Sequence, residues 1–333
     1  MRRRSLLLAA VPAGLVTLSA CGDNKSASSK ASASPTPSVT TAPAPKIVEG
    51  PLPAITAGAK FGEKPTVAKG TGEPSPNLAV RTLIAGSGRT VAENEFVQAH
   101  YLGQIWDTAK VFDNSYDRHT PLVIQLAQGS IIDGWRYALT GKKTGSRVEI
   151  AVPPTWGYGK NGQPQAGIKG TDTLVFVIDL IDSFNSKSSA KGKEVAQTDA
   201  ALPKVATNTD GAVPKVTVPK TAPPKKLVSE YVLEGDGDEL KADQTVLCQF
   251  QGLVWDGGKT FQRTYGSGRL AQFSLQQMQQ VVKGLADGLT GKKVGSRVLI
   301  VVPPELGYSN VPSGGPIKKD STLVYTVDIL AAL

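Results

Sequence analysis

The sequence contains few of the residues that carry most enzyme chemistry. Its 333 residues include only two histidines, His100 and His119, and two cysteines, Cys21 and Cys248. This scarcity gives no support to a histidine-rich metal site or to a Ser-His-Asp enzyme. No P-loop is present either, because Gly86-Ser-Gly88 lacks the strand–loop–helix context of such a motif. We expect neither a metal nor a cofactor, and we interpret His100 and Cys248, both in apolar runs, as core residues.

An apolar run near the N-terminus is too short to cross a membrane. It extends from Leu6 to Leu18, below the roughly 20 residues that a spanning helix needs. Three arginines precede it and Leu18-Ser19-Ala20-Cys21 ends it, an arrangement typical of a secretory signal. These last four residues resemble the lipobox of bacterial lipoproteins, whose cysteine is lipidated. We predict a signal peptide at 1–20 and a lipid on Cys21; alternatively, an ordinary signal is cleaved and Cys21 is incidental.

Two segments are short of apolar residues. Residues 21–59 are rich in Ser, Ala, Thr and Pro. The second segment, residues 186–212, opens a lysine-rich stretch: eight lysines between Lys187 and Lys226, against Glu194, Asp199 and Asp210, supply much of the formal charge of +9. Such compositions bury too little apolar surface to fold alone, so we predict a disordered tether and a flexible linker. No aromatic residues interleave with the lysines, so we expect no nucleic-acid partner.

The chain contains a long internal repeat. The stretch from Thr140 to Pro154 returns almost unchanged 150 positions later, from Thr290 to Pro304. Solenoid repeats have periods of roughly 20–50 residues, so this interval indicates two copies of one domain. We place these domains at 60–185 and 213–333, each large enough for one small core.

Alternation of apolar and polar residues dominates both copies. Strands are predicted at 79–84, 96–106, 122–126, 146–152 and 173–181, and again at 228–233, 245–255, 271–275, 296–302 and 322–330. One short helix is predicted in each copy, at 132–139 and 282–289, and a glycine follows each. The pattern favours an α+β domain in which a mostly antiparallel sheet wraps one short helix.

An ordered set of motifs resembles one known family. The motifs are His100-Tyr-Leu-Gly103, Val111-Phe-Asp-Asn-Ser115, Asp117-Arg118, Ile131-Ile-Asp-Gly-Trp135, Val152-Pro-Pro154, Gly157-Tyr-Gly159 and Thr173-Leu-Val-Phe176. Together they resemble the FKBP-type peptidyl-prolyl cis-trans isomerases, from about residue 78 to 184 and again from about 227 to 330. The resemblance implies a bent sheet of five or six strands and an apolar pocket between sheet and helix.

The resemblance also implies a role for each site residue. Trp135 would form the pocket floor, and the walls would be Tyr101, Phe112, Ile131, Ile132, Ile168 and Phe176. The backbone N–H of Ile132 would bind the substrate carbonyl before the proline, and the Tyr158 hydroxyl would bind another. Asp113 would lie at the rim, held by Tyr101 and Arg118. Leu122 stands where the family often has an aromatic residue, and Ala127 where it often has glycine.

Such a site needs no acid–base chemistry. Rotation about an X-Pro bond requires the loss of amide resonance, with a barrier of about 18–20 kcal/mol. The twisted amide is less polarised than the planar one, so leaving water costs it less. A dry aromatic pocket therefore binds the twisted form more strongly, which is what catalysis requires.

The second copy departs from the first where the chemistry would occur. Gln262 replaces Asp113, Leu285 replaces Trp135, Phe250 replaces Tyr101, and nothing matches Asp117-Arg118. An apolar concavity would remain, lined by Phe250, Phe261, Val281, Val282, Leu285, Tyr308, Ile317 and Tyr325. We predict that this copy is a weak or inactive isomerase that binds extended chains or spaces the first domain.

The sequence thus favours a membrane-anchored, extracytoplasmic and monomeric isomerase that acts on proline-containing segments of exported polypeptides. The alternative is a non-catalytic module in which both pockets bind peptide segments. A metal-handling folding factor is disfavoured, because the thirteen residues between Gly159 and Thr173 leave no room for an additional domain.

Overall fold

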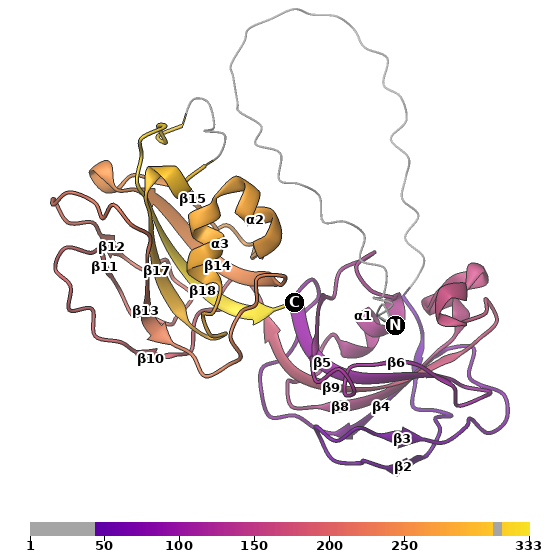
Figure 1. The fold of residues 1–333 in the computed structure, drawn as a ribbon. Helices are drawn as coiled ribbons and strands as arrows, with labels where there is room; N and C mark the ends of the chain where they lie inside the picture. The colour runs from indigo at the N-terminus through magenta and orange to yellow at the C-terminus, as the bar shows by residue number, and fades with distance from the viewer. Residues whose placement is uncertain (1–43, 309–314) are drawn as a thin grey trace, which may run out of the picture. The chain divides into compact units, whose positions relative to one another are not determined.

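The computed structural model describes residues 44–308 and 315–333, which form two compact units (Figure 1). The predicted signal peptide, Cys21 and most of the predicted tether lie outside the described residues. Within the described part, no helix is both long and apolar enough to span a membrane. The unit boundary falls between residues 181 and 182, and the α+β organisation in two similar domains is confirmed.

Domain 1 is a seven-stranded sheet with one helix, rather than the five or six strands expected. Its path is β1 (Ile47–Val48), β4 (Leu78–Ile84), β8 (Arg147–Val152), β9 (Leu174–Phe184), β5 (Phe96–Ile105) and β6 (Val111–Asn114). The seventh strand, β7 (Leu122–Gln125), pairs with β5, and α1 (Asp133–Leu139) contacts β8 and β4. Single 3₁₀ turns lie at Pro154–Trp156, Gly159–Asn161 and Pro164–Ala166.

Domain 2 repeats this order with one additional helix. Its path is β10 (Lys193–Glu194), β13 (Val228–Glu234), β17 (Arg297–Val302), β18 (Leu323–Ala332), β14 (Thr245–Val254) and β15 (Thr260–Arg263). Strand β16 (Ala271–Ser274) pairs with β14, α3 (Lys283–Leu289) corresponds to α1, and 3₁₀ turns lie at Asp256–Gly258 and Pro304–Leu306. The additional helix α2 (Leu275–Val281) has no counterpart in domain 1.

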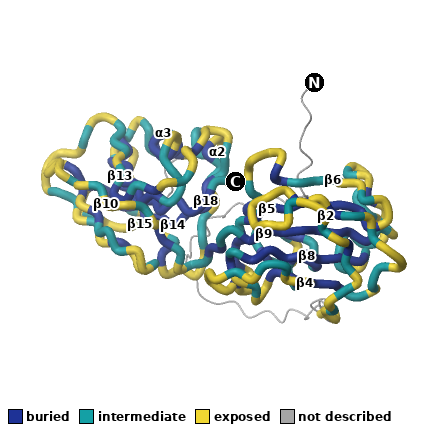
Figure 2. Tube along the Cα trace, turned by 90° about the horizontal axis from the view of Figure 1, so that it is seen from below, coloured by how far each residue is buried: buried dark blue, intermediate teal, exposed yellow. Residues whose placement is uncertain are grey.

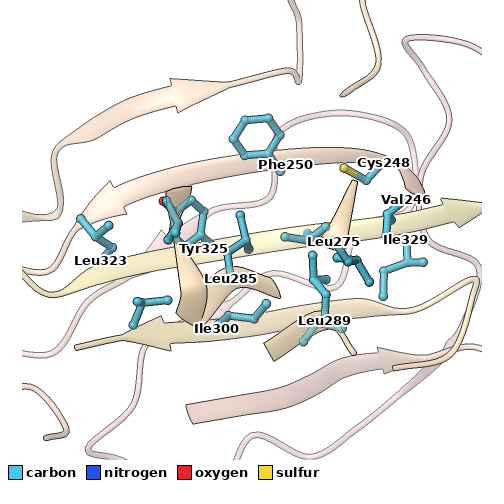
Figure 3. Packing of buried hydrophobic residues seen from close by; sticks show 14 of the residues in the cluster. Val246, Cys248, Phe250, Leu275, Leu285, Leu289, Ile300, Leu323, Tyr325 and Ile329 are labelled. Atoms are coloured by element: carbon cyan, nitrogen blue, oxygen red, sulfur yellow. The ribbon is translucent and has the colours of Figure 1, made fainter. Parts of the chain in front are cut away.

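Each helix lies close to its sheet because a glycine faces the central strand. A Cβ atom at Gly134 would lie 2.5 Å from Val152, and one at Gly284 would lie 2.5 Å from Val302. The helix side of domain 2 encloses an apolar cluster that Figure 3 shows in part, with Leu285 and Leu289 from α3 facing Ile300 and Tyr325 from the sheet. Cys248 belongs to this cluster, so its interpretation as a core residue is confirmed.

The central strands are buried on both faces. A flexible tether and a flexible linker would have left one face of each sheet exposed. Every residue of β8 is buried (Figure 2), and so is every residue of β17. Helices cover one face of each sheet, and segments N-terminal to each repeat cover the other. We call these segments strap 1 (residues 44–72) and strap 2 (residues 187–221). Strap 1 contains the pair β2 (Ile55–Ala57) and β3 (Thr66–Val67), and strap 2 contains the pair β11 (Lys204–Val205) and β12 (Val216–Thr217).

The two predictions of flexible chain were therefore wrong for the straps. In strap 1, Val48, Leu52, Ile55 and Val67 pack in a cluster with sheet residues such as Trp106 and Val175. In strap 2, Ala190, Leu202 and Val205 pack in a cluster with Trp255, Leu299 and Val324. The predicted linker at 186–212 is thus mostly part of domain 2, and the part of the predicted tether after residue 43 belongs to domain 1.

A buried arginine fastens each strap to its sheet. Arg147 pairs with Asp179 at 2.6 Å, and its guanidinium donates to the carbonyls of Gly58 (2.5 Å) and Glu63 (2.7 Å). Arg297 pairs with Asp328 at 2.6 Å in the same way and donates to the carbonyls of Ala206 and Asn208, both at 2.8 Å. The repeat unit therefore includes its strap.

Glu149 on β8 is a buried carboxyl group whose charge should make the stability of domain 1 depend on pH. Its side chain is 0% exposed, Arg81 donates to Oε2 at 2.6 Å, and Oε1 has no partner among the described residues. Burial raises the pKa of Glu149 although Arg81 opposes the shift. A carboxyl group whose pKa is raised in the folded state stabilises the fold fully below its unfolded pKa, and this contribution is lost as the pH rises through the folded pKa.

We therefore expect Glu149→Gln to raise the free energy of unfolding, relative to the wild type, more at pH 7 than at pH 4. Urea unfolding at the two pH values measures this difference. Glu305→Gln, at an exposed position of domain 2, is the control and should show no such pH dependence. An equal effect of Glu149→Gln at both pH values would contradict the role of the buried charge.

Candidate functional site

Four aromatic rings from different elements meet in domain 1. Trp135 on α1 is only 1% exposed and makes edge-on contacts with Tyr101 on β5 (5.3 Å between ring centroids) and Phe176 on β9 (5.5 Å). Phe112 on β6 packs edge-on against Phe176 at 5.6 Å. The indole thus lies inside the ring cluster, where the sequence placed the floor of the site.

A glycine on β5 makes room for these rings. A Cβ atom at Gly103 would lie 2.7 Å from Phe112 and 2.8 Å from Phe176. Sequence reasoning gave Gly103 no role of its own. The signal was nevertheless present, because Gly252 occupies the same place in domain 2, where a Cβ atom would lie 2.5 Å from Phe261.

A hydrogen-bonded carboxylate lies beside the rings. The Tyr101 hydroxyl donates to Oδ2 of Asp113, and Arg118 donates to Oδ1 at 2.5 Å and to the Tyr101 hydroxyl at 3.2 Å. Burial, followed by the hydrogen bond to Asp113, raises the pKa of Tyr101, so its hydroxyl stays protonated and donates. This confirms the predicted contacts of Asp113 with Tyr101 and Arg118.

Tyr158 lies near the same carboxylate. Burial and the negative charge of Asp113 raise the pKa of Tyr158 to about 12. Its hydroxyl is therefore a neutral donor at physiological pH. That this hydroxyl faces the same substrate as Asp113 stays a prediction.

For the other predicted site residues the structure gives the burial but no contact with the ring cluster. Ile131 and Ile168 are buried, whereas Leu122 on β7 and Ile132 are half-buried. Ile132 immediately precedes α1, and its carbonyl accepts from the N–H of Trp135 at 3.0 Å. The contribution of these four residues to the site stays a prediction.

His100 belongs to a supporting network rather than to a metal site. Its Nδ1 lies 2.9 Å from the Ser115 hydroxyl oxygen, which also accepts from the Tyr101 N–H at 2.8 Å. The ring stacks on Tyr116 with 5.0 Å between centroids. Among the described residues, no group of three His, Cys, Asp or Glu side chains could hold a metal ion.

Domain 2 keeps aromatic contacts, and among its described residues Gln262 replaces the carboxylate that lies beside the rings of domain 1. Phe261 contacts Tyr325 at 5.8 Å and Tyr308 at 6.3 Å, while Phe250 packs against Phe273 at 4.9 Å. Leu285 and Tyr325 lie in the buried cluster (Figure 3), to which Val282 and Ile317 also belong. Burial raises the pKa of both Tyr308 and Tyr325. Gln262 and Ser267 stand where Asp113 and Arg118 form the ion pair of domain 1.

Helix α2 changes the backbone hydrogen bonding immediately before α3. The N–H of Val282 donates to the Met278 carbonyl at 2.9 Å, so this amide is already engaged within the domain. It corresponds to the Ile132 amide, which the resemblance assigns to the substrate carbonyl. Val281 is 44% exposed at the end of α2, unlike its buried counterpart Ile131, and its place in an apolar wall stays a prediction.

Comparison with known proteins identifies both halves of the chain. The model of one family, described as FKBP-type peptidyl-prolyl cis-trans isomerase, matches residues 87–181 and 237–330, more than half of the chain. An FK506-binding protein of Streptomyces anulatus is 38% identical over 119 residues, which cover 36% of this chain and 96% of that protein.

Two further relatives are longer than the regions they share with this chain. The peptidyl-prolyl cis-trans isomerase FKBP9 of Mus musculus is 29% identical over 266 residues, covering 77% of this chain and 38% of FKBP9. The crystal structure of FkpA from Escherichia coli is 37% identical, covers 35% of this chain and 52% of that chain, and has a TM-score of 0.30. The chain thus spans less than two thirds of either relative.

Proposed function

Because the chain belongs to the family of FKBP-type peptidyl-prolyl cis-trans isomerases, we propose that domain 1 carries most of its activity. One observation supports this division above all. The Asp113 carboxylate, bound by Tyr101 and Arg118, lies beside the ring cluster of domain 1, whereas domain 2 has Gln262 and an engaged Val282 amide.

The residues of domain 1 favour the twisted amide without exchanging a proton with it. The buried rings of Trp135 and Phe176 exclude water, which disfavours the polar planar amide more than the twisted one. The protonated hydroxyl of Tyr158 is available to a substrate carbonyl. An acceleration of about 10⁴–10⁵ requires only about 5.5–7 kcal/mol, which desolvation and two hydrogen bonds can provide.

A protease-coupled assay with a proline-containing tetrapeptide tests this activity. The purified chain should accelerate the cis-to-trans conversion. Complete absence of acceleration would favour the second candidate, a non-catalytic module that binds peptide segments. Peptide binding without catalysis fits domain 2 best, because this domain retains the apolar cluster but has Gln262 in place of the carboxylate.

We further propose that the protein is a lipoprotein on the outer side of a cell membrane, where it assists the folding of exported polypeptides. The support is the leader at 1–20, followed by Cys21 in a lipobox-like sequence. Two acyl chains on one residue give stable attachment, whereas one chain gives marginal binding.

We expect Cys21→Ala to move most of the protein from the membrane fraction to the soluble fraction. Fractionation of the producing cells, with mass spectrometry of the N-terminal peptide, measures both location and lipid. Cys248→Ala is the control, because Cys248 is buried in domain 2 and should not affect attachment. Retention of Cys21→Ala in the membrane fraction would contradict the anchor.

A further inference from the structure

A large cleft opens in domain 2 beside strap 2. Its volume is about 1,040 Å³. Its walls are strap 2, the turn between β14 and β15, and the loop before β18, with Lys215, Val218, Lys220, Trp255, Lys259 and Lys318 among them. Typical small-molecule sites have volumes of roughly 300–1,000 Å³, so this cleft has room for a short stretch of polypeptide.

Side chains of the sheet hold the end of strap 2, as they hold the end of strap 1. In domain 1, Gln104 and Trp106 hold the carbonyls of Ala68 and Gly72, four positions apart. In domain 2, Gln251 and Trp255 hold the carbonyls of Pro214 and Thr221, seven positions apart. Gln251 stands at the position of Leu102 rather than of Gln104, so only the tryptophan contact is common to the two straps; the stretch from Lys215 to Thr221 forms one wall of the cleft.

The opposite wall of the cleft has fewer side chains than the corresponding turn of domain 1. Domain 1 has Thr108-Ala109 in the turn after Trp106, whereas domain 2 has Gly257-Gly258 in the corresponding turn after Trp255. A Cβ atom at Gly257 would meet nothing within 4 Å, and one at Gly258 would meet only Val218, at 3.8 Å. The two glycines therefore leave open space in which side chains would otherwise stand.

The cleft carries an excess of positive charge. It is lined by Lys215, Lys220, Lys259 and Lys318, against the two carboxylates of Asp256 and Asp320. Among the described residues, the ion-paired lysines of domain 2 are Lys191, Lys283 and Lys293, none of which lines the cleft. The corresponding loops of domain 1 are balanced, with Lys69, Lys110 and Lys169 against Glu73, Asp107 and Asp172. Uncompensated lysines around a cleft attract an anionic partner.

We propose that this cleft binds an extended polypeptide segment with acidic side chains. Val216, Val218 and Pro219 lie between the lysines and offer apolar contact to a peptide. The ring of Trp255 is buried and its Nε1–H is bound to the Thr221 carbonyl, so the cleft lacks the exposed ring on which a nucleic-acid base would stack. The role of the cleft as a second binding site for a client chain rests on the proposed function. Its affinity for an acidic peptide is independent of that function.

The test measures fluorescence anisotropy of a labelled ten-residue peptide of alternating glutamate and valine, titrated with the full chain. The cleft variant replaces Lys215, Lys220, Lys259 and Lys318 by glutamine. The control variant replaces four other exposed lysines of domain 2 by glutamine, Lys193, Lys225, Lys226 and Lys241, and so changes the net charge equally. We expect roughly tenfold weaker binding for the cleft variant and less than about twofold for the control.

Three outcomes would overturn the proposal. They are equal weakening by both variants, equal binding of a glutamine–valine peptide, and binding of oligothymidylate as tight as that of the acidic peptide. Isomerase activity of the cleft variant should equal that of the wild type, so failure of the cleft and failure of the isomerase function are separable. An inactive chain that still binds the acidic peptide through these lysines would remove only the proposed function.

Discussion

Replacing Trp135 by leucine and Asp113 by glutamine, the residues that domain 2 carries at these positions, should reduce the kcat/KM of the full chain about 100-fold. The leucine removes the ring that contacts Tyr101 and Phe176. The glutamine removes the charge that binds Arg118 and acts on Tyr158. The protease-coupled assay with a proline-containing tetrapeptide measures the loss.

The matched control changes the equivalent positions of domain 2. Leu285→Met with Gln262→Ala should leave kcat/KM within about twofold of the wild type, since Gln262 already stands in place of the Asp113 carboxylate and the Val282 amide is engaged. If the control variant lost most of the activity, or the domain 1 variant lost none, the division of labour between the domains would be refuted.

The second large effect concerns the strap rather than the site. Arg147→Met should lower the stability of domain 1 by about 3–5 kcal/mol, because it leaves Asp179 buried without its charge partner. It also removes the donors to the Gly58 and Glu63 carbonyls. For a domain of this size the loss corresponds to a fall in Tm of roughly 10–20 °C, measurable by calorimetry.

The straps provide the control for this experiment. Arg297→Met leaves Asp328 unpaired and should instead expose strap 2, where limited proteolysis would cut near Ala206 and Asn208. Arg147→Met should give cuts near Gly58 and Glu63. Adding Asp179→Leu to Arg147→Met should recover part of the lost stability, because no charge is then left buried. Identical cleavage patterns for the two arginine variants would show that the arginines do not fasten separate straps.

The alternating strands and the two glycine-terminated helices could be predicted from the sequence, because their patterns are local. Helix α2 was missed although its start is marked, since Ser274 accepts from the N–H of Gln277 and the spacing from Ser274 to Gln277 matches a capping box. The straps could not be predicted in this way. Their apolar residues are scattered among lysines, and the fastening from Arg297 to Ala206 joins residues 91 positions apart.

More of the site than of the fold around it could be predicted from the sequence. Tyr101, Asp113 and Arg118 meet as expected, because the motifs that carry them are short and ordered along the chain. Two features depended on three-dimensional packing and were missed: the space that Gly103 leaves for Phe112, and the engagement of the Val282 amide by Met278. The engagement of the Val282 amide follows from α2, which contains Met278. Because that helix was not predicted, this difference between the two sites was not predicted either.

The buried arginines also determine where the chain may be divided. A fragment that begins at residue 213, the border that composition suggests, would lose the carbonyls of Ala206 and Asn208 and would bare the apolar side chains on the far face of β17. The unit that was duplicated is therefore the sheet with its own cover, and a functional dissection of the two halves has to cut close to residue 185.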